Sequence, residues 1–452
     1  MDQRETVTLA SRALDRWLDF TSWAERVPSL SVGVAVNGET FFARAYGFED
    51  LATRKPATPS TLYRIASHSK LFTATAIMKL LEAGRLRLDD PISEHLGWFE
   101  SDADANLVGV TVRELLTHSS GMNRDGVTGH WLNDEFPQPE AIRDQARAGL
   151  SVFESVEHWK YSNMGFTILG QVIEAVTGSS YENAVIELVV RPMGLTDTAP
   201  DFDESTEPRH ATGYGIAYPD RDREQFAHVH ARAMNSATGF SSNVPDLLRF
   251  YARHQPGGGD FLSERSRREM QRVQFQDGPY AWGLGFAVDR SGAETTVGHG
   301  GAYPGYMTAS AMNPATGVTI VVLTSAMDGR PQLFLNGIAS LLRYAGAHAG
   351  ELAADASDEP AYYDRVAGFY GSRWGVLAME RLGGKLVSIP LDLSLPPGDG
   401  IGRFAYLGDG RFRFDDGPQN GMFGEDLEFV EADSGFVMRS GTGDQGRFSF
   451  AR

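Results

Sequence analysis

The sequence predicts an α+β chain in which an antiparallel sheet is flanked by helices, with an all-helical insertion inside it and a smaller β-structure after it. The pair Asn37-Gly38 lies between two β-rich runs and favours a tight hairpin turn. Residues 318–324 form a continuous β-branched run, as in buried strands. Because these strands lie far apart in the sequence, the sheet is expected to combine both ends of the segment.

The elements of residues 1–348 follow from periodicity and from start and stop signals. Leu9, Ala13, Trp17 and Phe20 recur at helical spacing. Thr111 and Glu114 form a capping box. Helices are expected over residues 9–20, 67–84, 111–116, 163–178 and 333–342, with another start at 242–245. Strands are expected over residues 30–36, 40–46, 282–288 and 318–324. Residues 123–160 have no clear period and suit a segment that shapes the substrate site.

The character of the chain changes near residue 350. Residues 345–359 are rich in Ala, Gly, Asp and Glu, as in a linker. Short alternating segments separated by glycine then fit a small antiparallel barrel or sandwich. We therefore predict domains at 1–348 and 361–452, joined by a linker at 349–360. Aromatic residues of the second domain are expected in its core, namely Phe412, Phe414, Phe448 and Phe450.

Composition excludes several classes of function. The chain has 452 residues, more than one ordinary domain, and a formal net charge of −18, which disfavours nucleic acid and anionic membranes as partners. It has no cysteine, so thiolate nucleophiles and disulfides are excluded. No secretory or membrane-spanning pattern is found. We expect a cytoplasmic enzyme that acts on a small molecule without metal or cofactor, and a homo-oligomer is left open.

The segment Ser67-His68-Ser69-Lys70 carries the first chemical signal. Ser67 and Lys70 lie three residues apart, so on a helix they share one face. A lysine amine in a poorly solvated pocket loses its charge and can accept the serine proton. Ser69 points elsewhere and is the weaker candidate. The alternative is a serine at a helix start followed by a solvated lysine, and this motif alone does not decide between the two.

Two further motifs follow in a fixed order and carry a resemblance. Tyr161-x-Asn163 precedes a helix, and His299-Gly300-Gly301 precedes the 318–324 strand. Together with Ser67-x-x-Lys70, this order resembles the serine β-lactamase-like superfamily, in particular class C β-lactamases, class VIII esterases and D-stereospecific aminopeptidases. The resemblance covers roughly residues 10–345 and implies the fold of β-lactamases and penicillin-binding proteins. Residues 360–452 resemble the lipocalin-like barrel of some D-amino-acid peptidases.

The resemblance implies a role for each residue. Ser67 would be the acylated nucleophile, and Lys70 and Tyr161 would share the proton transfer, with the choice of base left open. Asn163 would orient the side chains and the substrate. The backbone N–H groups of Ser67 and Ala302 would form the oxyanion hole. The structural alternatives are that Tyr161 is an aromatic at a helix start and Asn163 a helix cap.

One motif departs from the pattern of the superfamily. Many members have Lys-Thr-Gly where this chain has His299-Gly300-Gly301. A histidine is mostly neutral at pH 7 and Gly300 has no hydroxyl, so we expect weak recognition of anionic β-lactams. The expected function is a carboxylesterase of the class VIII type on small acyl esters. The alternatives are a D-stereospecific aminopeptidase or amidase, a weak β-lactamase, and a non-catalytic ligand sensor.

Other histidines and other hydrolase classes give weaker signals. His118 is a candidate general base, although a histidine that fixes a loop is the more common case. An α/β-hydrolase would need Gly-x-Ser-x-Gly, which this chain lacks. A zinc hydrolase is disfavoured because His228-x-His230 has no carboxylate near it in the sequence.

Overall fold

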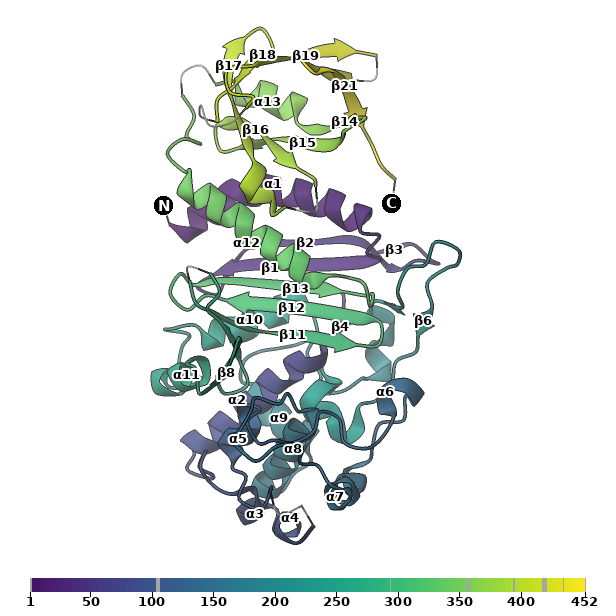
Figure 1. Cartoon of the computed structure of the whole chain (residues 1–452), viewed down its shortest axis with the longest axis vertical. Helices are drawn as coiled ribbons and strands as arrows, with labels where there is room; N and C mark the ends of the chain where they lie inside the picture. The colour runs from purple at the N-terminus through teal and green to yellow at the C-terminus, as the bar shows by residue number, and fades with distance from the viewer. Residues whose placement is uncertain are drawn as a thin grey trace. The chain divides into compact units, whose positions relative to one another are not determined.

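The computed structural model describes residues 2–102, 106–292, 294–355, 358–392, 395–416, 421–433 and 435–451. These residues form two compact units, 28–331 in one and 1–27 with 332–452 in the other (Figure 1). The first and last helices of the predicted first domain thus belong to the unit that holds the C-terminal strands. Independent folding of residues 361–452 stays a prediction, and residues 356 and 357 of the predicted linker lie outside the described residues.

The first unit contains a nine-stranded antiparallel sheet in the order β3-β2-β1-β13-β12-β11-β10-β9-β8. The sheet therefore joins both ends of the segment, as the sequence predicts. The hairpin turn between β1 and β2 has Asn37 and Gly38 at φ 50° and 82°, the backbone of the predicted tight turn. The strands are β1 Ser29–Val36, β2 Glu39–Asp50, β3 Lys55–Pro56, β8 Phe275–Asp277, β9 Tyr280–Trp282, β10 Ala287–Asp289, β11 Thr296–Tyr303, β12 Tyr306–Met312 and β13 Val318–Thr324.

The predicted strand over residues 282–288 is wrong. The chain reverses inside this run, so β9 ends at Trp282 and β10 begins at Ala287, and these two residues pair antiparallel. Gly285 lies at φ 82°, and the N–H of Gly283 donates to the carbonyl of Phe286. Glycine permits this turn, which a run of alternating residues does not reveal.

Most helices of this unit gather below β11 in Figure 1, whereas α10 packs on the sheet against β1 and β13. Helix α2 is buried over nearly its whole length, and its residues belong to one core together with residues of α8 and α10. The predicted capping box of Thr111 and Glu114 opens α5. The helices are α2 Ser69–Glu82, α3 Ile92–His95, α4 Gly97–Asp102, α5 Val112–Leu116, α6 His130–Asn133, α7 Pro139–Ala148, α8 Asn163–Thr177, α9 Tyr181–Val185, α10 Val244–His254 and α11 Glu264–Gln271.

The second unit holds a closed eight-stranded antiparallel barrel, which decides between the predicted barrel and sandwich. Two of its strands and one helix were not predicted, namely β14, β15 and α13. The helices are α1 Gln3–Ala24, α12 Pro331–Ala347 and α13 Pro360–Val366. The strands are β14 Gly368–Ser372, β15 Gly375–Leu382, β16 Lys385–Pro390, β17 Gly402–Gly408, β18 Arg411–Phe414, β19 Asp426–Ala432, β20 Gly435–Ser440 and β21 Gly443–Phe448.

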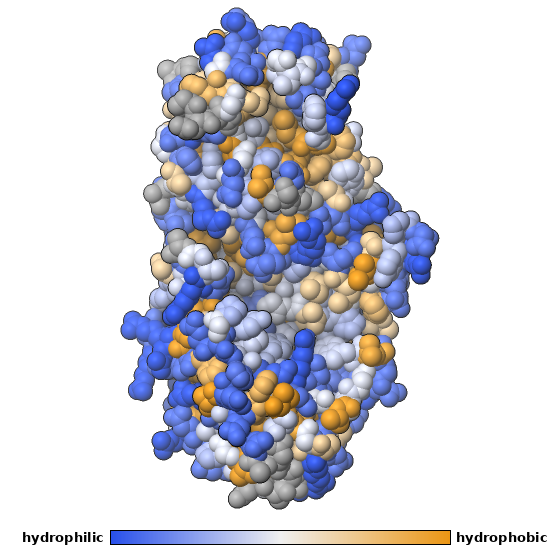
Figure 2. All heavy atoms as spheres, in the orientation of Figure 1, coloured by the Kyte–Doolittle hydropathy of each residue, from blue (hydrophilic) through white to orange (hydrophobic). Residues whose placement is uncertain are grey.

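The predicted aromatic core of the barrel divides into two groups. Phe412 and Phe414 are buried in the barrel core, as predicted. Phe448 and Phe450 are only partly buried and contact Phe20 of α1, with ring centroids 6.3 and 5.9 Å away. Trp23 of α1 stacks on Phe450 at 4.6 Å. The apolar side of α1 thus covers this end of the barrel. On the face shown in Figure 2, hydrophobic residues form only scattered patches.

Candidate active site

Ser67 lies in a 3₁₀ turn, η1 Ala66–His68, that leads directly into α2. It is partly exposed, whereas His68, Ser69 and Lys70 are buried. Ala66 lies at φ 51°, a left-handed backbone that a non-glycine residue seldom adopts. Ser69 is fixed inside the protein because its Oγ donates to the Ala66 carbonyl at 2.5 Å and accepts from the Phe240 N–H at 3.0 Å. Of the two serines, Ser67 is therefore the one that a substrate can reach.

The amine of Lys70 is buried and points at oxygen atoms. Its Nζ donates to Ser67 Oγ at 3.3 Å, to Asn163 Oδ1 at 2.6 Å and to the Ala237 carbonyl at 2.8 Å. Burial holds the pKa of Lys70 well below its usual value of 10.5. The alternative of a solvated lysine is therefore wrong. The neutral form of this amine can accept a proton from Ser67.

Tyr161 lies beside both of these residues. The Lys70 Nζ is 4.9 Å from the centroid of its ring. Burial raises the pKa of Tyr161 above 10, while a hydrogen bond to Ser67 and the charge of Arg124 act in the opposite direction. The structure thus brings Ser67, Lys70 and Tyr161 together. Burial favours the neutral form of the phenol, and the choice of base between Lys70 and Tyr161 stays a prediction.

Asn163 is the first residue of α8, and it is Ser162 that caps the helix by accepting from the Gly165 N–H. The alternative of Asn163 as a helix cap is therefore wrong. Its Oδ1 accepts from Lys70, and its Nδ2 donates to Asp125 Oδ1 at 2.6 Å. The same Asp125 oxygen accepts from Trp131 Nε1 at 2.9 Å. Sequence analysis missed Asp125, which lies in the segment without clear period.

Strand β11 brings its glycines against the turn that carries Ser67. A Cβ added at Gly301 would lie 2.5 Å from the Ile65 carbonyl and 3.0 Å from Ala66 Cβ. Only glycine therefore allows this close approach. Gly300 and Ala302 are exposed on the same strand. The role of the Ala302 N–H as an oxyanion donor stays a prediction.

His299 is a buried neutral imidazole. Burial and the neighbouring His68 and Lys70 hold its pKa well below 6.5. Its Nδ1 lies 2.5 Å from the Gly300 carbonyl, which can only accept, so we assign the proton to Nδ1. Its Nε2 is then an acceptor, and it is buried without a partner among the described residues. This atom cannot replace the charge of the lysine found in Lys-Thr-Gly relatives.

His118 fixes a loop beside the site. Its backbone lies at φ 59°, and its Nδ1 accepts from the Ser162 N–H at 3.1 Å. Its ring lies 4.4 Å from that of Tyr161. Burial holds its pKa well below 6.5. These contacts agree with the interpretation of His118 as a loop-fixing residue.

Aromatic side chains form a wall next to Tyr161. Trp159 stacks on Tyr280 at 4.3 Å, and Trp282 lies 5.3 Å from Trp159 and 5.6 Å from His299. The Nε1 atoms of Trp159 and Trp282 have no partner among the described residues. Because these two nitrogen atoms are buried, the wall offers aromatic surface to an apolar group. The sequence signal is weak, since Trp159 lies far along the chain from Tyr280 and Trp282 of β9.

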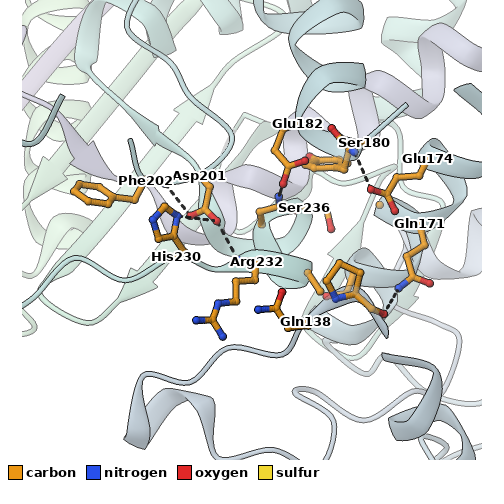
Figure 3. A pocket seen from close by; sticks show the side chains of 16 residues that line it. Gln138, Gln171, Glu174, Ser180, Glu182, Asp201, Phe202, His230, Arg232 and Ser236 are labelled. Carbon is orange, nitrogen blue, oxygen red and sulfur yellow. Dashed lines mark hydrogen bonds and ion pairs between the residues drawn. The ribbon is translucent and has the colours of Figure 1, made fainter. Parts of the chain in front are cut away.

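A separate cavity of about 520 Å³ lies behind α8 (Figure 3). None of the predicted site residues lines it. Its carboxylates already have protein partners: Glu182 accepts from Asn235, Glu174 from the Tyr181 N–H, and Asp201 from Arg64.

His228 of the His228-x-His230 pair packs against an aromatic ring. His228 stacks on Phe202 at 4.4 Å, and burial lowers its pKa to about 3. Across the described residues, no group of three or more His, Asp or Glu side chains could hold a metal ion. In the same part of the chain, no helix has the length and apolarity to cross a membrane.

The fold agrees with that of known proteins. The sequence profile of the Beta-lactamase family matches residues 14–342, and the chain belongs to this family, whose fold is that of serine hydrolases. Protein flp of Staphylococcus aureus (strain N315) is 24% identical over 324 residues, which are 70% of this chain and 63% of flp. The chain thus spans less than two thirds of that relative.

Three solved structures share the fold. The octameric penicillin-binding protein homologue from Pyrococcus abyssi is 23% identical with a TM-score of 0.62, and the match covers 96% of this chain and 99% of the other. EstCE1, a hydrolase with promiscuous acyltransferase activity, is 22% identical with a TM-score of 0.64 over 75% and 99%. The D-amino acid amidase from Ochrobactrum anthropi SV3 is 24% identical with a TM-score of 0.62 over 75% and 99%.

Proposed function

We propose that this chain hydrolyses small acyl esters through an acyl-enzyme on Ser67. The observation that carries the proposal is the buried Lys70 amine, which touches Ser67 Oγ and has a depressed pKa. An uncharged amine at this place removes the serine proton as the hydroxyl attacks the ester carbonyl. Tyr161, hydrogen-bonded to Ser67, shares that proton transfer.

The proton and the bonds balance over two steps. The Ser67 Oγ–C bond forms, the ester C–O bond breaks, and the proton taken by the Lys70–Tyr161 pair passes to the leaving alkoxide. Water then attacks the acyl-enzyme, gives its proton to the same pair, and Ser67 leaves with that proton. The N–H groups of Ser67 and Ala302 would stabilise the oxyanion in both steps. Asn163 holds Lys70 in line through its Oδ1.

The ester preference is supported by the neutral wall of the site. His299 carries no charge, and Trp159, Trp282 and Tyr280 offer aromatic surface to an apolar acyl or leaving group. A D-amino-acid amide is the second candidate, because the solved D-amino acid amidase shares this fold. Its amine leaving group needs a proton to depart, which makes it a more demanding substrate for the same pair.

A substrate panel tests the proposal. The wild type and Ser67→Ala are compared on 4-nitrophenyl butyrate, D- and L-alanine 4-nitroanilide, and nitrocefin. We expect the highest kcat/KM on the butyrate and no turnover by Ser67→Ala. Ser69→Ala is the matched control, although its buried hydroxyl supports the turn and its loss will lower the stability. A D-anilide that is hydrolysed faster than the ester would favour the amidase, and no turnover of any substrate would support the ligand sensor.

A further inference from the structure

The loop of residues 123–126 places two opposite charges beside Tyr161. The carbonyl of Arg124 accepts from the N–H groups of Asn163 and Met164 at 2.7 and 3.2 Å. Ser162 Oγ donates to the Asn123 carbonyl at 2.7 Å. The loop is therefore tied to the first turn of α8 by its backbone, and replacing the side chain of Arg124 leaves these bonds in place.

The two charges differ in what they can still bind. Both oxygens of Asp125 have partners: Oδ1 accepts from Asn163 and Trp131, and Oδ2 pairs with Arg124 Nε at 3.3 Å. The Asp125 side chain is 24% exposed, whereas that of Arg124 is 63% exposed. Within the described ranges, the Nη1 and Nη2 atoms of Arg124 have no hydrogen-bond partner. The Arg124 guanidinium thus presents hydrogen-bond donors to solvent, whereas both carboxylate oxygens of Asp125 already accept from protein groups.

The guanidinium of Arg124 lies beside the ring of Tyr161. Its Cζ is 5.6 Å from the centroid of the Tyr161 ring, and the hydroxyl of the same residue meets Ser67. On β11, His299 is a neutral imidazole, and the buried Lys70 amine has a depressed pKa. A planar guanidinium can hold a carboxylate through two parallel hydrogen bonds, and stacking on an aromatic ring fixes its plane.

We propose that Arg124 is a specificity-determining residue that binds a carboxylate on the substrate. The proposal rests on the acyl-ester function assigned to Ser67. The guanidinium lies at the ring of Tyr161 and Ser67 at its hydroxyl, so a substrate that reaches both has its carboxylate and its reacting carbonyl at opposite ends of a short chain. A mono-ester of a dicarboxylic acid has this shape. The anionic group is thus recognised from the 123–126 loop, while the Lys-Thr-Gly position of the relatives is neutral here.

Three six-carbon esters that differ only in their last group test the proposal. They are the mono-4-nitrophenyl ester of adipic acid, 4-nitrophenyl hexanoate and 4-nitrophenyl 6-aminohexanoate. We expect the ratio of kcat/KM for the adipate ester to that for the hexanoate to fall about tenfold in Arg124→Met, as for the loss of a charge-assisted contact. The ratio should fall less in Arg124→Lys, because lysine keeps the positive charge but lacks the two parallel N–H donors of the guanidinium. In the wild type the ratio should shrink as salt is added.

A matched variant and a binding measurement complete the test. Arg268→Met removes an exposed arginine from α11, and the same ratio should not change. Calorimetry on Ser67→Ala with monomethyl adipate and methyl hexanoate measures binding without turnover, and adding Arg124→Met should weaken only the adipate. Equal effects on both ligands, or a wild-type preference for the aminohexanoate, would overturn the proposal. If no ester is hydrolysed but the calorimetric difference persists, the esterase function fails and the carboxylate site stands.

Discussion

Replacing Gly301 by alanine should separate β11 from the turn that carries Ser67. The new Cβ would lie 2.4 Å from Thr308 Oγ1 and 2.5 Å from the Ile65 carbonyl. Thr308 could rotate, but its Oγ1 already contacts His68 Nδ1 at 3.1 Å. The Ile65 carbonyl belongs to the backbone two residues before Ser67, so relief requires a shift of the strand or of the turn.

The size of the effect follows from this overlap. Overpacking a well-packed core costs about 1–3 kcal/mol. In a unit of this size, each kcal/mol lowers the Tm by roughly 1–2 °C. A misplacement of about 1 Å between reacting groups can cost on the order of a hundredfold in rate. We therefore expect Gly301→Ala to unfold a few degrees earlier and to lose most of its kcat for 4-nitrophenyl butyrate.

Gly300→Ala is the matched control one residue away. The nearest atom to its added Cβ is the Thr308 carbonyl at 3.6 Å, an ordinary contact. Thermal unfolding and kcat/KM are measured for both variants beside the wild type. Gly300→Ala should keep the wild-type Tm. Similar losses in the two variants would refute the packing argument, since only Gly301 meets the Ile65 carbonyl.

Two further predictions concern titrating groups. Lys70 and Tyr161 act on one proton, so kcat should fall by similar factors in Lys70→Met, in Tyr161→Phe and in the double variant. If the loss of kcat in the double variant equals the product of the two single losses, the two residues have independent roles. Burial lowers the pKa of His254 from 6.5 to about 4, so the unfolded chain binds a proton there that the folded chain does not, and stability is lost as the pH falls from 6.5 to 4. This histidine contributes about 3 kcal/mol to that loss. The free energy of unfolding is measured with urea at pH 7 and pH 4.5, and it should differ less between the two pH values for His254→Gln than for the wild type. An equal difference in the two proteins would count against burial as the cause.

The nucleophile and its partners could be predicted because their geometry is local. The spacing of Ser67 and Lys70 alone places them on one helix face. Tyr161-x-Asn163 lies at the start of a helix that ends at Gly178. The contact of Lys70 with the Ala237 carbonyl is not local, because it joins residues 167 positions apart. No period or motif marks such a contact, so sequence analysis could not place it.

The missed features share a physical cause. Arg124 and Asp125 lie in a loop held by backbone hydrogen bonds to α8, which leave no pattern of apolar residues. The break between β9 and β10 depends on the positive φ of Gly285. Strand β15 has no clean alternation because Glu380 is buried, with Arg12 and Arg16 of α1 as its partners. In the loop and in β15 a tertiary contact overrides the local signal, and at Gly285 a local backbone conformation interrupts the strand.

The central claim is that Ser67 is the residue that becomes acylated. The direct measurement is intact-mass analysis followed by peptide mapping. It is applied to the protein after reaction with a fluorophosphonate, and to the wild type quenched during turnover of 4-nitrophenyl butyrate. We predict one adduct per chain, located on Ser67 and absent in Ser67→Ala, and a butyryl group on the same residue. An adduct on Ser69, or an unlabelled chain that still hydrolyses the ester, would contradict the account.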